Sequence, residues 1–463
     1  MRPDGVEMPR GGVPVASAAH APGEDACTPP SSLTRLDGFD VVALLLLLCL
    51  VATLALTLVV PMTYDEAWTW LWVARRGPWY ALSSYEVPNN HTLFSIVESL
   101  LPVAAVRAFP ALIRVPNLVV AAFVTLVLAR LSPKPRWLWT SLALASSPLL
   151  TIYVFLARGY LMGSLYVLLA GVAIDRGHDG LAGVCAGLAA ATVPTFIFVV
   201  PGFVLLLVRR RAGKWLGAGV RFGTACVLSA LLFYWPKLAT VASMGHRYGS
   251  HWPLSWVARD TLGVLGANTW LSFALLAVVA WGLSRKQCSN SDVAKLLVAG
   301  CVSYVGTVAL LVTFHAMRVP YMRNGTFLPL FLLAAVLVLA ADSTSGLYRR
   351  VALAVLLLSA GMNVVKFVDV FVLKRSEPSA YAPMATLSAT PLHRFEGATP
   401  ARIEVGWAAE PAAQLFFEGN GVRVTINDGI DLRERCLAGS VPGPPGTRVR
   451  IVYADGTRGL SCF

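Results

Sequence analysis

The stretch VVALLLLLCLVATLALTLVVPM, residues 41–62, contains no charged side chain. At about 1.5 Å per residue, a helix of this length spans the roughly 30 Å hydrocarbon core of a bilayer. A cleaved signal peptide has a shorter apolar region and a small-residue cleavage site, whereas this stretch runs into Pro61 and an acidic pair. We therefore predict a first transmembrane helix that is not removed.

The composition of the whole chain predicts that lipid is its main solvent. Of 463 residues, 56% are hydrophobic and 14% are charged, against about 45–50% and about 25% in soluble domains. This balance, with a mean hydropathy of +0.65, excludes a soluble globule, a disordered chain, collagen and a coiled coil. The net charge of +13 is attributed to basic residues that cap apolar runs, not to nucleic-acid binding. No CxxC pair or Cys/His metal spacing occurs among the 8 Cys, so a zinc or iron–sulfur site is not expected.

Further uncharged stretches follow the first one, at 115–129, 137–157, 159–174, 180–208, 222–236, 261–284, 296–314, 324–341 and 351–365. Lys and Arg in short loops mark the cytoplasmic side of a membrane. The basic clusters are Arg130/Lys134/Arg136, Arg176, Arg209/Arg210/Arg211/Lys214, Arg285/Lys286 and Arg349/Arg350, and all of them should lie inside.

Two choices place these clusters on one side. Residues 91–109, which contain Glu98 and Arg107, must lie along the outer interface without crossing, and residues 180–208, interrupted by Pro194 and Pro201, must make two short passes. The sequence then predicts an all-α polytopic membrane protein with about eleven transmembrane helices. The alternative, in which residues 91–109 cross, places the cluster around Arg130 outside.

The chain is expected to have three parts. Residues 1–38 predict a disordered cytoplasmic tail, residues 39–375 a transmembrane domain with a first outer loop at 63–110 that carries interfacial helices, and residues 376–463 a small extracytoplasmic α/β domain. Strands are expected there at 402–405, 422–426 and 447–453. Whether Cys436 and Cys462 of this domain form a disulfide is left open by the sequence.

An acidic pair, Asp65-Glu66, directly follows the first apolar stretch. Thr63 and Glu66 match the capping box S/T-x-x-E, which gives Glu66 an alternative role as a helix cap. Asp65 has no such defined structural task, although any acid in a first helical turn gains from the helix dipole. Because a carboxylate at the membrane surface can deprotonate a hydroxyl or amine, we predict Asp65 as a general base and Glu66 as a second catalytic candidate.

Cations and aromatic residues gather on the segments expected at the same outer face. Arg158 stands alone between two uncharged stretches, where an ionisable side chain marks a functional site or snorkels to the interface. His91 either contacts a phosphate or starts a helix behind the cap Asn90. The other binding candidates are Arg114, Tyr160, His246, Arg247, Arg318, Tyr321 and Arg323. Since Arg binds phosphate bidentately, a base among these cations predicts attack on a group that leaves as phosphate.

In their order and spacing, these motifs resemble the integral-membrane glycosyltransferases of the GT-C type, specifically the protein mannosyltransferase and aminoarabinose transferase branch (glycosyltransferase family 39-like). The resemblance covers roughly residues 40–345. It is carried by Asp65-Glu66, the turn from Pro88 to Leu93, Arg114-Val115-Pro116, Ser147-Pro148 with Ala157 to Tyr160, and Arg318 to Pro329.

The resemblance implies a GT-C fold, with residues 39–375 as the catalytic domain in the cytoplasmic (inner) membrane. It also implies an inverting transfer of a sugar from a polyprenyl-phosphate donor to a lipid, glycan or protein acceptor at the outer face. Asp65 would be the base, and His91, Arg158 and Arg323 would lie near the donor phosphate. No cofactor is assigned, and a divalent metal stays open.

Two other functions are considered. A transporter or flippase of a lipid-linked or small polar substrate would also need many crossings with polar groups. Transporters usually show internal repeats and broken helices near the bilayer midplane, whereas this sequence shows no clear repeat and gathers its ionisable residues at one face. The third is a scaffold whose outer tail binds a partner.

Overall fold

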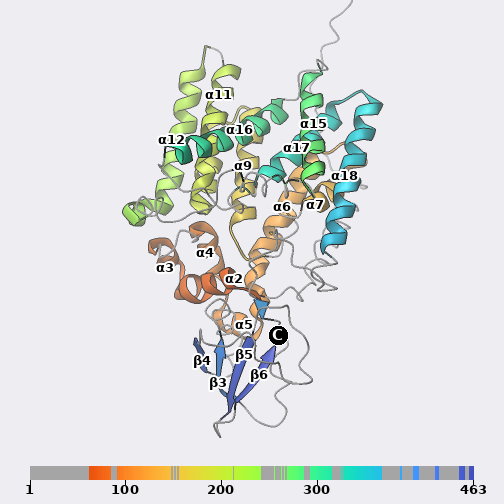
Figure 1. Cartoon of the computed structure of the whole chain (residues 1–463). Coiled ribbons are helices and arrows are strands. Elements are labelled where there is room, and N and C mark those ends of the chain that lie inside the picture. Colours follow the sequence, from red (N-terminus) through yellow and green to blue (C-terminus); the bar gives the residue numbers. More distant parts are fainter. Residues whose placement is uncertain are drawn as a thin grey trace, which may run out of the picture. The chain divides into compact units, whose positions relative to one another are not determined.

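The computed structural model in Figure 1 describes residues 62–84, 91–147, 150, 153, 156–211, 213–240, 255, 262, 265, 268–285, 292–314, 325, 327–367, 386–387, 400–405, 423–426, 448–453 and 458–462. The chain divides into two units, Met1–Arg35 and Leu36–Phe463, and every described element belongs to the second. The predicted tail 1–38 lies outside the described residues, as does the first predicted transmembrane stretch apart from Met62.

Short elements follow the first apolar stretch. The strand β1 (Met62–Thr63) leads into α2 (Tyr64–Trp68), the π-helical turn η2 (Thr69–Val73) and the 3₁₀ turn η3 (Ala74–Arg76). Then come α3 (Pro78–Ser83), α4 (Thr92–Glu98), α5 (Val103–Ala108) and the 3₁₀ turn η4 (Pro110–Arg114). The 7 residues of α4 and the 6 of α5 are each far short of the about 20 that a single membrane-spanning helix needs.

Longer apolar helices make up most of the remaining described chain. They are α6 (Val115–Leu131), α7 (Arg136–Ser146), α9 (Tyr160–Asp175), α10 (Asp179–Thr192), α11 (Val200–Arg210), α12 (Trp215–Tyr234, continued by η6, Trp235–Lys237), α15 (Thr269–Ser284), α16 (Asp292–Thr313), α17 (Phe327–Asp342) and α18 (Gly346–Phe367). Their bounds follow the predicted uncharged stretches. The largest differences are that α7 ends already at Ser146, α12 includes Arg221, and α15 begins only at Thr269.

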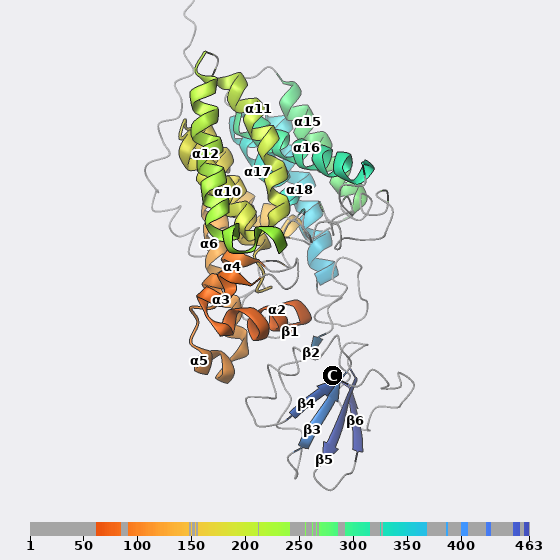
Figure 2. The ribbon, with the colours of Figure 1, turned by 90° about the vertical axis from the view of Figure 1, so that its left-hand side faces the viewer.

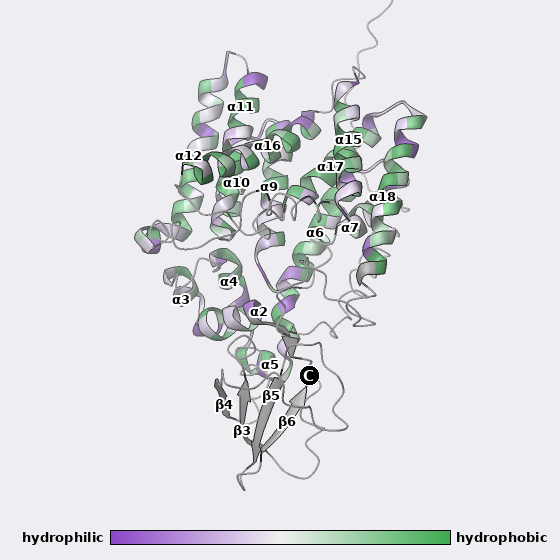
Figure 3. Ribbon diagram, viewed as in Figure 1, coloured by the Kyte–Doolittle hydropathy of each residue, from purple (hydrophilic) through white to green (hydrophobic). Residues whose placement is uncertain are grey.

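Within the described part of the chain, four helical segments are long and apolar enough to cross a membrane: Pro110–Leu131, Trp215–Thr240, Asp292–Thr313 and Gly346–Val365. Shorter apolar helices accompany them, and hydrophobic residues colour much of their length in Figure 3. On α12, large apolar side chains such as Leu228 and Leu232 are more than half exposed. Exposed apolar faces of this extent suit lipid and not water, so the chain is a helical membrane protein.

The stretch 180–208 is broken at its first proline. Val193 is extended, with φ −136° and ψ 106°, because a residue that precedes proline is disfavoured in a helix. The chain passes through η5 (Pro194–Val199) and starts α11 with Pro201 in its first turn. Asp179 at the start of α10 lies 3.5 Å from Arg211, which directly follows α11. The segment from α10 to α11 therefore begins and finishes at the same end of the helices.

An ion-pair cluster defines this end. Arg210 pairs with Asp175 at the end of α9 (3.0 Å) and with Asp292 at the start of α16 (3.3 Å). Asp179 pairs with Arg211 and, at 2.9 Å, with Arg221. We call this the ion-pair end; it contains the predicted cytoplasmic cluster around Arg210. The opposite ends of α9 and α10, at Tyr160 and Thr192, form the site end.

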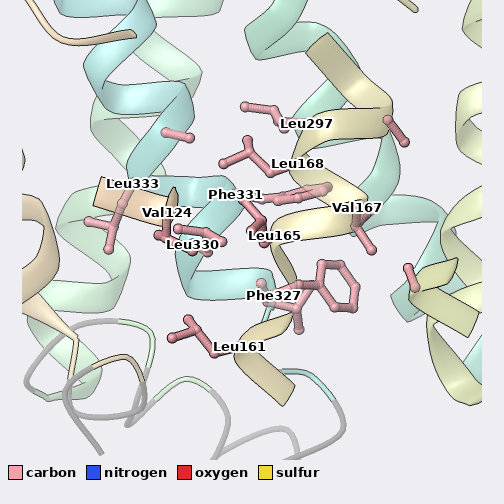
Figure 4. Packing of buried hydrophobic residues seen from close by; sticks show 14 of the residues in the cluster. Val124, Leu161, Leu165, Val167, Leu168, Leu297, Phe327, Leu330, Phe331 and Leu333 are labelled. Atoms are coloured by element: carbon pink, nitrogen blue, oxygen red, sulfur yellow. The ribbon is translucent and has the colours of Figure 1, made fainter. Parts of the chain in front are cut away.

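The core is centred on α17, which is buried from Phe327 to Ala340. A helix that is apolar on all sides needs neighbours on all sides. Figure 4 shows its Phe327 and Phe331 among Leu161, Leu165 and Leu168 of α9. The Phe327 ring also meets the rings of Phe196 and Tyr304, with centroids 4.9 Å apart in each pair.

Glycines bring α10 and α12 close together, and the two helices run side by side in Figure 2. A Cβ atom added at Gly183 would collide with the Phe222 carbonyl oxygen, and one added at Gly187 would collide with the Cys226 carbonyl oxygen and the Ser229 hydroxyl. Small residues spaced four apart let helix backbones approach closely in membranes. This pair therefore sets the spacing of the two helices.

The C-terminal part contributes strands. β2 (Thr386–Leu387) pairs antiparallel with β1, with Met62 opposite Leu387. A four-stranded sheet has the order β4 (Arg423–Ile426), β3 (Pro400–Val405), β5 (Arg448–Tyr453), β6 (Arg458–Cys462), and only the β3–β4 pair is parallel. The first three match the predicted strands within two residues, whereas β6 was not predicted. Cys436 lies outside the described residues, so the possible disulfide with Cys462 stays open.

Candidate functional site

A buried ion pair fixes the arrangement of α2, the start of α6 and residues 156–158, which we call the frame of the site end. Glu66 of α2 accepts hydrogen bonds from Arg114 Nε (2.7 Å) and Arg114 Nη2 (2.9 Å). Both side chains are buried. A bidentate Arg–carboxylate pair holds its two partners in one orientation. Glu66 thereby ties α2 to the start of α6, a contact different from the capping box that its sequence pattern predicted.

Hydrogen bonds between the segment before α9 and the side chains of Glu66 and Asn117 hold this segment in place. The backbone N–H of Ala157 donates to Glu66 Oε1 at 2.8 Å. From α6, the side-chain amide of Asn117 donates to the carbonyls of Leu156 (2.7 Å) and Tyr153. Residues 156–158 are therefore held from two sides, and these contacts position the next side chain, Arg158.

Arg158 is buried and reaches α2 and η2. Its Nη1 donates to Thr69 Oγ1 (2.7 Å) and to the Asp65 carbonyl (3.1 Å), and its Nη2 lies 3.9 Å from Asp65 Oδ2. Thr69 Oγ1 in turn donates to the Asp65 carbonyl at 2.8 Å. Thr69 opens the π-helical turn, a rare feature that is frequent at functional sites. A buried cation is thus fixed beside a carboxylate that is 28% exposed.

His91 packs beside this group, immediately before α4. Its Nδ1 donates to the Thr192 carbonyl (3.1 Å), and its ring meets that of Tyr160 edge-on at 4.4 Å. The contact needs Gly159, since a Cβ there would lie 2.6 Å from Thr192 Cγ2 and 2.9 Å from His91 Cβ. His91 is buried, so the alternative in which it merely starts a helix and is exposed is wrong. The Arg158 guanidinium carbon lies 5.9 Å from the Tyr160 ring centroid.

Glu98, the last residue of α4, is a carboxyl group that sequence reasoning did not select. It is fully buried, and neither oxygen has a hydrogen-bond partner among the described residues. Burial raises the pKa of Glu98 well above its ordinary value, Arg158 opposes this rise, and the negative charge of Glu66 adds to it. An unsatisfied buried polar group typically costs about 1–3 kcal/mol of stability, so Glu98 is expected to destabilise the folded chain.

Lys237 joins the end of α12 to the same region. Its Nζ donates to Thr92 Oγ1 (2.7 Å) and to the Ser84 carbonyl (3.2 Å), and the side chain is buried. The helical segment that contains Lys237 runs from Trp215 to Thr240. Its C-terminal end therefore lies at the site end, next to α4.

The structure brings together six of the predicted residues: Asp65, Glu66, His91, Arg114, Arg158 and Tyr160. The other candidates, His246, Arg247, Arg318, Tyr321 and Arg323, lie outside the described residues. Besides Glu98, sequence reasoning missed Thr69, Asn117 and Lys237. Asn117 carried a usable signal, because it is a lone amide one turn after Arg114 in an otherwise apolar stretch.

Among the described residues, no group of three or more His, Cys, Asp or Glu side chains has the arrangement of a metal site. No family model, curated protein or solved structure matches the chain. Function therefore has to be argued from the geometry at the site end.

Proposed function

We propose that the chain is an inverting glycosyltransferase that moves a sugar from a polyprenyl-phosphate donor to an acceptor, with Asp65 as general base. The observation that supports this proposal is the pair of Asp65 and Arg158. A partly exposed carboxylate lies 3.9 Å from a buried guanidinium that is held by Thr69 and by the Asp65 backbone. Base and cation are the two groups that an inverting transfer to an acceptor hydroxyl or amine requires.

In the proposed reaction, Asp65 accepts the proton of the acceptor group as that group attacks the anomeric carbon. The new bond forms on the face opposite the phosphate, and the old carbon–oxygen bond breaks with its electron pair leaving on the phosphate oxygen. Arg158 stabilises this developing negative charge. The Tyr160 ring lies 5.9 Å from the Arg158 guanidinium carbon and contacts the His91 ring, while the pair of Glu66 and Arg114 holds α2 against the start of α6.

The division of the helices into two ends supports an orientation for this site. Arg176, Arg210 and Arg211 lie at the ion-pair end, and basic residues are enriched on the cytoplasmic side of membranes. We infer that the site end faces away from the cytoplasm, that the N-terminus is cytoplasmic, and that the chain crosses the cytoplasmic membrane about eleven times. Residues 376–463 are then an extracytoplasmic domain.

The test compares Asp65→Asn with the wild type in cells that lack the chromosomal copy. Mass spectrometry of the glycoconjugates lost from these cells first identifies the sugar and the acceptor. Purified protein is then assayed with that donor in lipid nanodiscs. We expect Asp65→Asn to lower product formation by at least about 100-fold, because general-base catalysis contributes about 10²–10⁴-fold. Expression and unfolding temperature should stay unchanged.

Asp292→Asn is the matched control, since it makes the same chemical change at the ion-pair end and should retain transfer. Wild-type activity of purified Asp65→Asn would refute the proposed base. Uptake of a labelled substrate into vesicles, without product and equally in both variants, would instead identify a transporter.

A further inference from the structure

We propose that Glu98 is a positioning residue of the Asp65–Arg158 site, and that the site binds an anionic phosphate more tightly while the Glu98 carboxyl carries its proton. The inference rests on the proposed function in one respect, namely that Arg158 is the cation which meets the donor phosphate. It adds a proton-binding group that touches neither donor nor acceptor.

The placement of Glu98 is the first argument. The residue ends α4, whose first residue, Thr92, follows His91 of the site. Its side chain is fully buried, and within the described part of the chain no donor reaches either oxygen. An acid that served only as a helix cap or surface group would be bonded or solvated. This carboxyl group is neither, although it belongs to the electrostatic surroundings of Arg158 and Glu66.

Its charge state follows from these surroundings. Burial favours the neutral form of an acid and raises the pKa of Glu98, the Arg158 charge lowers it by less, and the Glu66 charge raises it again. Neutral Glu98 adds no charge beside Arg158, whereas ionised Glu98 would add a negative charge that repels a phosphate.

Several other charged or titratable groups lie on the elements around α4 or contact it. α4 packs against η2, η3, α3 and α10. Arg76 donates to the Tyr80 hydroxyl at 2.6 Å, His91 to Thr192, and Lys237 to Thr92. Asp179 lies at the far end of α10, where it pairs with Arg211 and Arg221. The charged or titratable groups on these elements and beside α4 are Arg75, Arg76, Tyr80, His91, Asp179, Cys185 and Lys237.

Linkage makes the proposal measurable. If proton binding at Glu98 favours phosphate binding at Arg158, phosphate binding must favour the proton by the same factor. Coupling between sites in proteins is typically about 5–150-fold. The affinity for the phosphate should therefore fall by at least about 5-fold as Glu98 loses its proton.

The experiment measures binding of a polyprenyl monophosphate to the full chain in nanodiscs from about pH 6 to about pH 9, which lies above the ordinary glutamate pKa of about 4.3. The wild type should lose affinity as pH rises. Glu98→Gln keeps the shape and the neutral state, so it should bind as tightly as protonated wild type and lose less affinity than the wild type as pH rises. Glu98→Met also cannot ionise, and it provides the same comparison if Glu98→Gln does not fold.

The control is Asp342→Asn, which removes a carboxyl that interacts electrostatically with Asp175 of the ion-pair end, and it should follow the wild-type profile. Ionisation of the monophosphate itself is common to all variants and cancels in the comparison. Identical pH profiles for the wild type and both Glu98 variants, or a wild-type affinity that does not change with pH, would overturn the role of Glu98 while leaving the proposed function standing. Failure of the wild type to bind the phosphate at any pH would overturn both.

Discussion

At the scale of single residues, the neighbours Asp65 and Glu66 show how burial separates the tasks of two identical functional groups. Glu66 is fully buried and bonded to Arg114 and to the Ala157 backbone, so its charge is committed to the frame. Asp65 remains 28% exposed beside Arg158 and can meet a ligand. The structural acid and the candidate base thus differ in environment and not in chemistry.

Glu66→Gln should destabilise the protein strongly. The amide keeps the shape but leaves the Arg114 charge buried without a carboxylate, and breaking a buried pair from one side costs about 3–5 kcal/mol. The unfolding temperature in detergent measures the loss. Lys295→Gln, which breaks the exposed pair with Asp292, should cost only about 0–1 kcal/mol. Equal losses in both variants would show that the Glu66 pair does not hold the frame.

Glu98 should make stability fall as pH rises. A raised pKa means that the folded state holds the proton more tightly than the unfolded chain does. The resulting stabilisation is complete below the unfolded value of about 4.3 and is lost as pH rises through the folded pKa. We therefore expect the unfolding temperature of the wild type to decline more steeply toward alkaline pH than that of Glu98→Gln. Parallel curves would contradict this expectation.

At the scale of elements, the contact of α10 with α12 depends on glycine. Gly183→Ala or Gly187→Ala should lower the unfolding temperature, because the added methyl group meets backbone carbonyls that cannot move without separating the helices. Gly219→Ala and Gly223→Ala are the controls on α12, where a Cβ meets nothing within 4 Å. Alanine favours a helix over glycine by about 0.5–1 kcal/mol, so these controls should be neutral or slightly stabilising.

At the scale of the whole molecule, the two ends of the helices should face opposite sides of the membrane. Cysteines introduced at His178 and at Trp79, both exposed, test this in a variant whose own 8 cysteines are replaced. A thiol reagent that does not cross membranes should label position 79 in intact cells, and position 178 only after the membrane is opened. Labelling of both positions in intact cells would contradict the proposed orientation.

The sequence by itself determined the helical membrane class, most helix positions and the break after Thr192. Uncharged runs and prolines act locally, through the need to bury apolar side chains in lipid and through the steric limits of the residue before proline. Six candidates of the site end could be chosen for a similar reason, because an isolated charge in apolar surroundings is conspicuous in a sequence.

Only the tertiary structure decided what each of these residues does. Residues 66, 114 and 157 are far apart in the chain, and nothing local specifies that Glu66 pairs with Arg114 and Ala157 while Asp65 faces Arg158. In the sequence, Glu98 is one acid of a short interfacial segment, and only packing buries it with no hydrogen-bond partner among the described residues. Burial and long-range pairing set the charge states, and both arise from contacts that exist only in the folded chain.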